Sequence, residues 1–300
     1  MSRSFKSSLL TFLIVAGSSL FFCSKAVFVK LAYRYGLDAV TTLALRMAMA
    51  FPFFLIGGIW ASSGKHVKPL TGRDWARLAL VGFCGWYFSS VINFMGLEHV
   101  SVGLERMILY TYPSIVLLGS VLILRKPLKW GVAGAMLLSY LGILIGYYAE
   151  ASAKAGGETW LGALLVFGSA ISYAIFVLLS GEMISRIGPI RFTSCVVGFS
   201  CLYVLIHFVL THPPGAILKL PPGAYGCGVA LAIAGTVIPS YLFGIGLKRA
   251  GAQAFAVIGM IGPLGTVGLA WMLLGEAINP VQVLGLALTL AGGVIVAMKK

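Results

Sequence analysis

Charged side chains are scarce along this sequence, and acidic ones are the scarcest. Only 10% of the 300 residues are charged, and Asp and Glu together number 8. Soluble domains carry about 25% charged residues. A chain with so few could not cover a water-facing surface, so the composition argues against a soluble protein.

Cysteine and the familiar catalytic motifs are also in short supply. The five cysteines are odd in number and form no CxxC pair, so neither a disulfide framework nor a zinc site is supported. HExxH, GxSxG and Walker-type sequences do not occur. We therefore expect a protein that is not an enzyme and that has no metal and no cofactor.

Long apolar stretches are what the sequence has in abundance. Hydrophobic residues make up 59% of the chain and the mean hydropathy is +0.99. A helix needs about 20 apolar residues to cross the ~30 Å hydrocarbon layer, and the stretches lack the alternation of a β-barrel. We predict an all-α integral membrane protein with ten transmembrane helices, at residues 8–32, 38–60, 74–96, 101–124, 130–149, 158–182, 189–211, 223–246, 251–274 and 280–298.

The basic residues predict the orientation of these helices. The net charge is +14, but Lys and Arg occur in short clusters between apolar stretches, which is not the pattern of a nucleic-acid-binding surface. Most of them fall on one side when the ten spans alternate. The first apolar stretch continues past the length of a cleaved signal, through Val29. We expect a multi-pass protein of the plasma membrane, the bacterial inner membrane, with cytoplasmic N- and C-termini.

An internal repeat divides the chain into two halves. "ILYTYPSIVLLGSVLILRKPLKW" (108–130) aligns with "IGMIGPLGTVGLAWMLLGEAINP" (258–280) at an offset of 150, which matches Pro113 with Pro263. We predict two five-helix units, residues 1–150 and 151–300. Because five is odd, the second unit would enter the membrane from the opposite side, which gives the inverted repeat of many secondary transporters. Duplication without alternating access is the alternative.

The repeats resemble a known family. "AVFVKLAYRYGLDAVTTLALRMAMA" and "GPLGTVGLAWMLLGEAINPVQVLGLALTLAGGVIV" are similar to the EamA-type members of the drug/metabolite transporter superfamily. The Gly-Glu pair of that family is present as Gly275 and Glu276 but is replaced by Arg125 and Lys126 in the first half. Where the family usually has a tryptophan in helix one, this chain has Phe22.

The resemblance implies a carrier that works without ATP. We expect a secondary transporter, an exporter or exchanger of small metabolites such as amino acids, that works by alternating access. An ion-coupled multidrug exporter is the alternative, and an intramembrane enzyme is disfavoured by the missing motifs. The expected partners are a small-molecule substrate and the lipid bilayer, with no nucleic acid. Both a monomer and a homodimer remain open.

Four charged residues fall within the predicted spans, although charges at membrane depth cost at least ~2.5–3.5 kcal/mol each. They are Lys25, Arg46, Glu105 and Arg106, all in the first half and near the outer side. We predict that Lys25 and Arg46 attract an anionic group and that Glu105 pairs with one of them or carries a proton. A structural ion network is the alternative and is favoured for Arg46. Arg46 and Arg106 could also extend to the membrane interface.

Polar and aromatic residues near the helix prolines complete the predicted substrate-binding site. They are Trp86, Asn93, Tyr110, Tyr112 and Tyr173. Such aromatic residues more often pack helices or anchor them at the interface. Pro113, Gly262 and Pro263 are candidates for gating or for static helix kinks.

Overall fold

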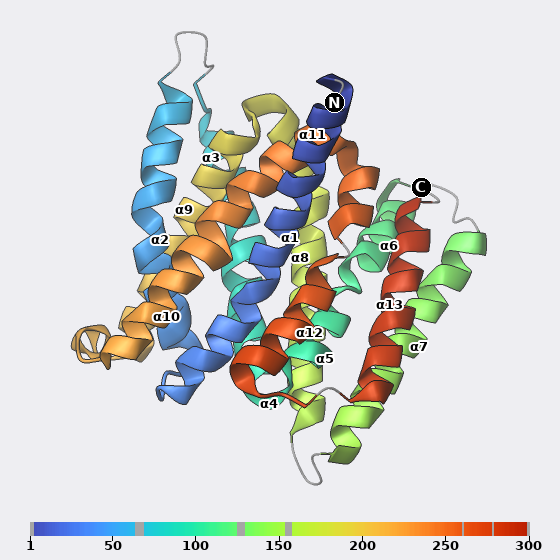
Figure 1. Ribbon diagram of the computed structural model, residues 1–300. Coiled ribbons are helices and arrows are strands. Elements are labelled where there is room, and N and C mark those ends of the chain that lie inside the picture. Colours follow the sequence, from blue (N-terminus) through green and yellow to red (C-terminus); the bar gives the residue numbers. More distant parts are fainter. Residues whose placement is uncertain are drawn as a thin grey trace.

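The computed structural model describes residues 3–63, 69–124, 130–153, 158–259, 261–277 and 279–298, and within these ranges every regular element is helical. Figure 1 shows a bundle of long, roughly aligned helices. The start of α1 and the end of α13 lie at the same end of the bundle (Figure 1). The all-α part of the sequence prediction is confirmed.

The first half begins with two long helices, α1 (Arg3–Arg34) and α2 (Ala39–Ser62). The carboxylate of Asp38 caps α2 by accepting a 2.9 Å hydrogen bond from the Thr41 amide. A third helix then runs without a break through α3 (Gly72–Gly82), the π-helical segment η1 (Phe83–Phe88) and α4 (Ser89–His99).

The fourth predicted helix is broken. It consists of α5 (Val102–Leu109) and α6 (Tyr112–Leu124), separated by Tyr110 and Thr111. The break follows from Pro113, whose ring has no N–H to donate and disfavours helix in the residue before it. One helix, α7 (Trp130–Ala153), completes this half.

The second half repeats the order with one difference. It contains α8 (Thr159–Ile187), α9 (Pro189–Thr211), the short 3₁₀ segment η2 (Pro214–Leu218), α10 (Pro222–Ala232), the π-helical η3 (Ile233–Val237), α11 (Ile238–Gly259), α12 (Ile261–Leu274) and α13 (Pro280–Met298). The sequence analysis placed a helix end at 247–250, whereas α11 continues to Gly259. Three alanines within 252–256 explain the continuation, because alanine has the highest helix propensity.

The two π-helical segments lie 150 residues apart, at the offset of the sequence repeat. Such segments are rare and are frequent at functional sites. Each packs against the first long helix of the other half: η1 against α8, and η3 against α1. Glycines allow the contact, since Gly85 lies on the Phe176 side chain and Gly235 lies beside Lys25.

Among the described residues, seven helices are long and apolar enough to cross a membrane, and α12 and α13 contain shorter apolar segments. Their outward side chains are large and apolar, including Leu210 at 79%, Met272 at 72% and Trp60 at 71% exposure. A surface of this kind suits contact with lipid. The structure confirms several membrane-spanning helices, while the total of ten in two inverted repeats remains a prediction.

Candidate functional site

A cluster of charged and amide side chains is buried where α1, α2, α4 and α5 meet. The Lys25 ammonium donates a hydrogen bond to Asn93 Oδ1 at 3.4 Å. The Asn93 amide in turn donates to Glu105 Oε1 at 2.9 Å. Asn93 is 1% exposed and Glu105 is fully buried. Three helices are therefore linked through polar groups in the interior.

Arg46 on α2 joins this region to the second half of the chain. Its Nε donates to Thr236 Oγ1 of η3 at 2.6 Å, and Thr236 donates to the Leu231 carbonyl at 2.7 Å. In a π-helical turn the backbone hydrogen bond joins residues five apart in the chain, rather than four apart as in an α-helix. The Leu231 carbonyl likewise lies five residues before Thr236. The hydroxyl of Thr236 thus satisfies a π-helical carbonyl and holds a buried guanidinium at once.

The ring of Phe94 lies close to both cations on α1 and α2. Lys25 Nζ is 5.7 Å and the Arg46 guanidinium carbon is 5.6 Å from the ring centroid. The negative face of an aromatic ring attracts cations at this range. Phe94 therefore allows the two positive charges to share one region of the interior.

Several charged atoms of the cluster have no aligned hydrogen-bond partner. Arg106 Nε forms an ion pair with Glu105 Oε2 at 2.9 Å, although neither atom makes an aligned hydrogen bond among the described residues. The other buried guanidinium donors without a partner among the described residues are Arg46 Nη1 and Arg106 Nη2. Buried charges of this kind are costly unless they are paired, so the arrangement is suited to receive an acceptor.

Aromatic rings form two groups beside the charged cluster. Phe22 on α1 lies one turn before Lys25, and its centroid is 6.5 Å from Trp86 and 6.4 Å from Phe243. The second group is a chain in which Tyr112 lies 6.4 Å from Tyr110 and 5.2 Å from Tyr173. These rings are half-buried, so they have apolar surface available to a bound molecule.

The structure brings together Lys25, Asn93 and Glu105, and Arg46 joins them through Phe94. Trp86 and the three tyrosines lie in the separate ring groups. Arg46 and Arg106 are 1% and 6% exposed, so neither reaches the interface. The roles of all these residues in binding remain predictions.

Thr236 is not among the site residues predicted from the sequence. The repeat offset of 150 contained the signal, since Thr236 corresponds to Trp86 in the first half.

Pro113 follows the break at Tyr110 and Thr111 as the second residue of α6, where proline fits a helix start. Pro263 is the third residue of α12, and residue 260 before that helix lies outside the described residues. Gly262 lets α12 approach α1 closely, because a Cβ there would be 2.6 Å from the Cys23 sulfur. Packing thus explains Gly262, and gating by any of the three remains a prediction.

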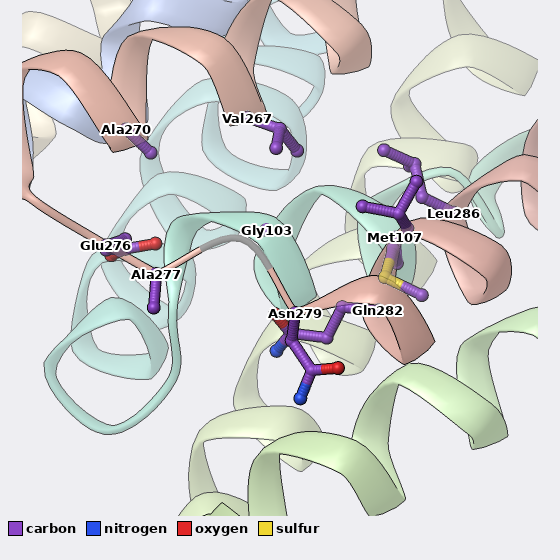
Figure 2. Close-up of a pocket in the computed structure, with 10 residues that line it drawn as sticks. Gly103, Met107, Val267, Ala270, Glu276, Ala277, Asn279, Gln282 and Leu286 are labelled. Carbon is purple, nitrogen blue, oxygen red and sulfur yellow. The ribbon is translucent and has the colours of Figure 1, made fainter.

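The Gly-Glu pair of the second half caps two helices. Gly275 has a φ of +70° and ends α12 in the left-handed conformation that glycine favours. Glu276 accepts a 3.4 Å hydrogen bond from the Val102 amide at the start of α5. Figure 2 shows Glu276 with Gly103 and Asn279 around a small pocket there. The first-half counterparts, Arg125 and Lys126, lie outside the described residues.

Comparison with known proteins gives the family. The profile of the EamA-like transporter family matches residues 9–148 and again residues 160–298. This chain belongs to the EamA-like transporter family. The resemblance inferred from the repeat motifs is confirmed.

Similar proteins support the same conclusion. The "Uncharacterized transporter YcbK" of Bacillus subtilis is 30% identical over 88% of this chain and 85% of its own length. An "Uncharacterized transporter" of Archaeoglobus fulgidus is 27% identical over 87% of this chain and 96% of its own. A crystal structure of another protein covers 99% of this chain and 98% of its own, with a TM-score of 0.65 and 17% identity, and shows the fold alone. The chain is a multi-pass membrane transporter.

Proposed function

We propose that this protein is a secondary transporter that exports or exchanges small metabolites, amino acids among them, across the bacterial cytoplasmic membrane. Ten spans in two inverted five-helix repeats alternate between outward-open and inward-open states, and both termini lie in the cytoplasm. The substrate binds at the charged cluster around Lys25, and the neighbouring aromatic rings contact its apolar part.

The observation that carries this proposal is the position of the cluster. Lys25, Asn93 and Glu105 come from the first half, and Thr236 and Gly235 of η3 come from the second. Transporters built from inverted repeats hold their substrates where the repeats meet and where helices are interrupted. The contact of Arg46 with η3 of the second half and the break at Tyr110, near Arg106 on the chain, support placing the site here.

An ion-coupled exporter is a second candidate, and Glu105 favours it. This carboxylate is fully buried, and its Oε2 lacks an aligned hydrogen bond among the described residues. Carboxylates inside membrane-spanning segments are often parts of proton pathways in transporters. Exchange of a proton carried by Glu105 for substrate would couple export to a pH gradient.

The test is uptake into proteoliposomes that contain the purified protein. A panel of labelled amino acids, organic acids and uncharged metabolites is offered with and without a pH gradient. We expect saturable, protein-dependent uptake of at least one compound. Uptake that does not respond to the gradient would remove proton coupling, and rates equal to those of protein-free vesicles for the whole panel would contradict the transporter proposal.

A further inference from the structure

The charged cluster contains more positive than negative side chains. Lys25, Arg46 and Arg106 carry three positive charges in their ordinary ionisation states. Against them stands the Glu105 carboxylate, which contacts Arg106 directly and Lys25 through Asn93. Arg46 and Arg106 are almost fully buried. The side chains of the cluster therefore have an excess of two positive charges.

No other acidic side chain of the sequence is placed to neutralise this excess. The chain has 8 acidic residues in all, and the contacts of the remaining acids lie at other places: Asp38 with His212, Asp74 with Arg186, Glu98 with the Ala39 amide, Glu150 with Ser101 and Gln282, Glu158 with His99, Glu182 with Arg77, and Glu276 with the Val102 amide. A bound anion would supply the missing negative charge.

Each arginine of the cluster keeps one guanidinium nitrogen that could receive an anion. Arg46 Nη1 and Arg106 Nη2 are buried without a hydrogen-bond partner among the described residues, while Arg106 Nε lies 2.9 Å from Glu105 Oε2. Guanidinium groups bind carboxylate and phosphate oxygens through pairs of parallel hydrogen bonds. Lys25, which is only partly buried, supplies a further positive charge beside Phe94.

We propose that the cluster of Lys25, Arg46, Arg106 and Glu105 binds a small dianion, a dicarboxylate or a phosphate group. The proposal rests on the proposed function and names the class of its substrate. Two negative charges balance the cluster, whereas a zwitterionic amino acid adds none and a monocarboxylate adds one. A second negative group should therefore raise affinity, because a charge excess in the interior is penalised.

The experiment measures equilibrium binding to the full-length protein in nanodiscs at pH 7.5. The probes are succinate and inorganic phosphate as dianions, acetate as a monoanion and alanine as a zwitterion. We expect at least one dianion to bind at least tenfold more tightly than acetate and alanine. Succinate without phosphate binding assigns a dicarboxylate site, and the converse assigns a phosphate site.

Variants connect the preference to the cluster. Lys25→Met and Arg106→Gln should each reduce dianion affinity at least tenfold, while the charge-retaining Lys25→Arg and Arg106→Lys keep the preference. The matched control is Arg77→Gln, which removes one positive charge from a half-exposed pair with Glu182 and should leave binding unchanged. Loss of binding in Arg77→Gln equal to that in Lys25→Met would overturn the assignment.

Two results would overturn the proposal itself. The first is that alanine or acetate binds as tightly as the dianions. The second is that neither dianion binds at roughly millimolar concentrations. Either result is separable from the proposed function, because proteoliposomes that transport alanine would still contain a working transporter. Conversely, dianion binding without transport of any panel member would support the site and contradict the transporter.

Discussion

Lys25 is the residue on which the proposed transport mechanism depends most directly. It reaches Glu105 only through Asn93, and it is partly exposed while its neighbours are buried. A structural ion pair would contact its acid directly, so the geometry favours contact with substrate. Lys25→Met keeps the length and the apolar stem of the side chain but removes the charge.

We predict that Lys25→Met abolishes transport in proteoliposomes and changes the unfolding midpoint little. Circular dichroism and size-exclusion chromatography check the fold, and Lys25→Arg serves as the charge-retaining control. Wild-type flux in Lys25→Met would place this lysine outside the binding site.

Thr236 has a structural role, unlike Lys25. It makes two hydrogen bonds and touches no substrate in the proposed arrangement. Neutral hydrogen bonds between membrane helices average about 0.6 kcal/mol, but bonds to charged groups contribute about 1.5–3 kcal/mol. The Arg46 bond belongs to the second class. We expect Thr236→Val to lower the free energy of unfolding by about 1.5–3 kcal/mol, measured by denaturant titration in micelles.

Two substitutions check the cause of that loss. Thr236→Ser keeps the hydroxyl and should remain close to wild type. Thr211→Val removes a hydroxyl that bonds its own helix at an exposed position and should also have little effect. Equal stability of Thr236→Val and Thr236→Ser would show that the Arg46 bond contributes nothing.

At the scale of whole elements, α7 and α13 approach each other closely. Gly142 lies against the backbone of α13: a Cβ there would be 2.7 Å from the Thr289 amide and would also meet the Gly285 carbonyl. Small residues permit such an approach between membrane helices. Backbone atoms cannot move aside as a side chain can, so the helices themselves would have to separate.

We therefore predict that Gly142→Ala destabilises the protein by about 1–3 kcal/mol, the usual cost of overpacking. The matched control is Gly134→Ala on the same helix, where no atom lies within 4 Å of the added Cβ. That substitution should be neutral or slightly stabilising, because alanine favours helix. Thermal unfolding of the two variants in one detergent makes the comparison, and equal midpoints would contradict it.

The start of α2 predicts a dependence on pH. Partial burial alone would raise the pKa of the Asp38 carboxyl, but hydrogen bonds from Thr41 and the charge of His212 outweigh it and hold the pKa below its usual value. The stabilisation is thus complete above the unfolded-state pKa of about 4 and is lost as the pH falls through the lower folded-state pKa.

We expect the unfolding midpoint of the wild type to fall more steeply below about pH 4 than that of Asp38→Asn. Asparagine also caps helices, so this variant keeps the cap and loses the titration. Parallel pH profiles for the two proteins would show that Asp38 makes no such contribution.

The helices were predictable from sequence because each is a long apolar run bounded by charges, proline or glycine. Pro113 marked a candidate kink in the fourth helix, but the position of the break at Tyr110 and Thr111 and the π-helical segments were not predictable, since both depend on which residue pairs with which carbonyl. The charges of Lys248 and Arg249 and the nearby Gly251 suggested a helix end, yet the alanine-rich residues after them continue α11 to Gly259. Breaks inside apolar runs are decided by local propensity and packing together.

The candidate site, like the helices, could be predicted from the sequence only in part. Lys25, Arg46 and Glu105 stand out in sequence because a charge in an apolar run needs a partner. Asn93 as the bridge and Phe94 as the shared ring depend on which face of α4 turns toward α1. The rotation of a helix about its axis is set by its contacts with neighbouring helices. A single sequence therefore does not show which face of α4 turns toward α1.

Over the whole molecule, the two halves share a fold but differ in chemistry. At the repeat offset of 150, Lys25 corresponds to Ile175, Arg46 to Val196 and Asn93 to Phe243. The charges thus belong to the first half, while the second contributes Thr236 and apolar rings. In the proposed alternating-access cycle, such a site would keep its fixed charges on one repeat while the other moves against it.

That asymmetry predicts how transport responds to voltage. The three cations and Glu105 are fixed in the protein, so the charge that crosses with each turnover is that of the substrate. For a dianion in uniport this is two negative charges, and each contributes about 2.3 kcal/mol per 100 mV of membrane potential. An interior that is negative, as in a living bacterium, then drives export.

We therefore predict that succinate efflux from preloaded proteoliposomes accelerates several-fold when valinomycin and an outward K⁺ gradient make the interior negative. Efflux of a zwitterion such as alanine, if it occurs at all, should not respond, because it carries no net charge. Succinate efflux of equal rate at both potentials would mean that another ion moves with each dianion or that one dianion exchanges for another. The fixed charges of the first repeat would then bind the substrate without making its export electrogenic.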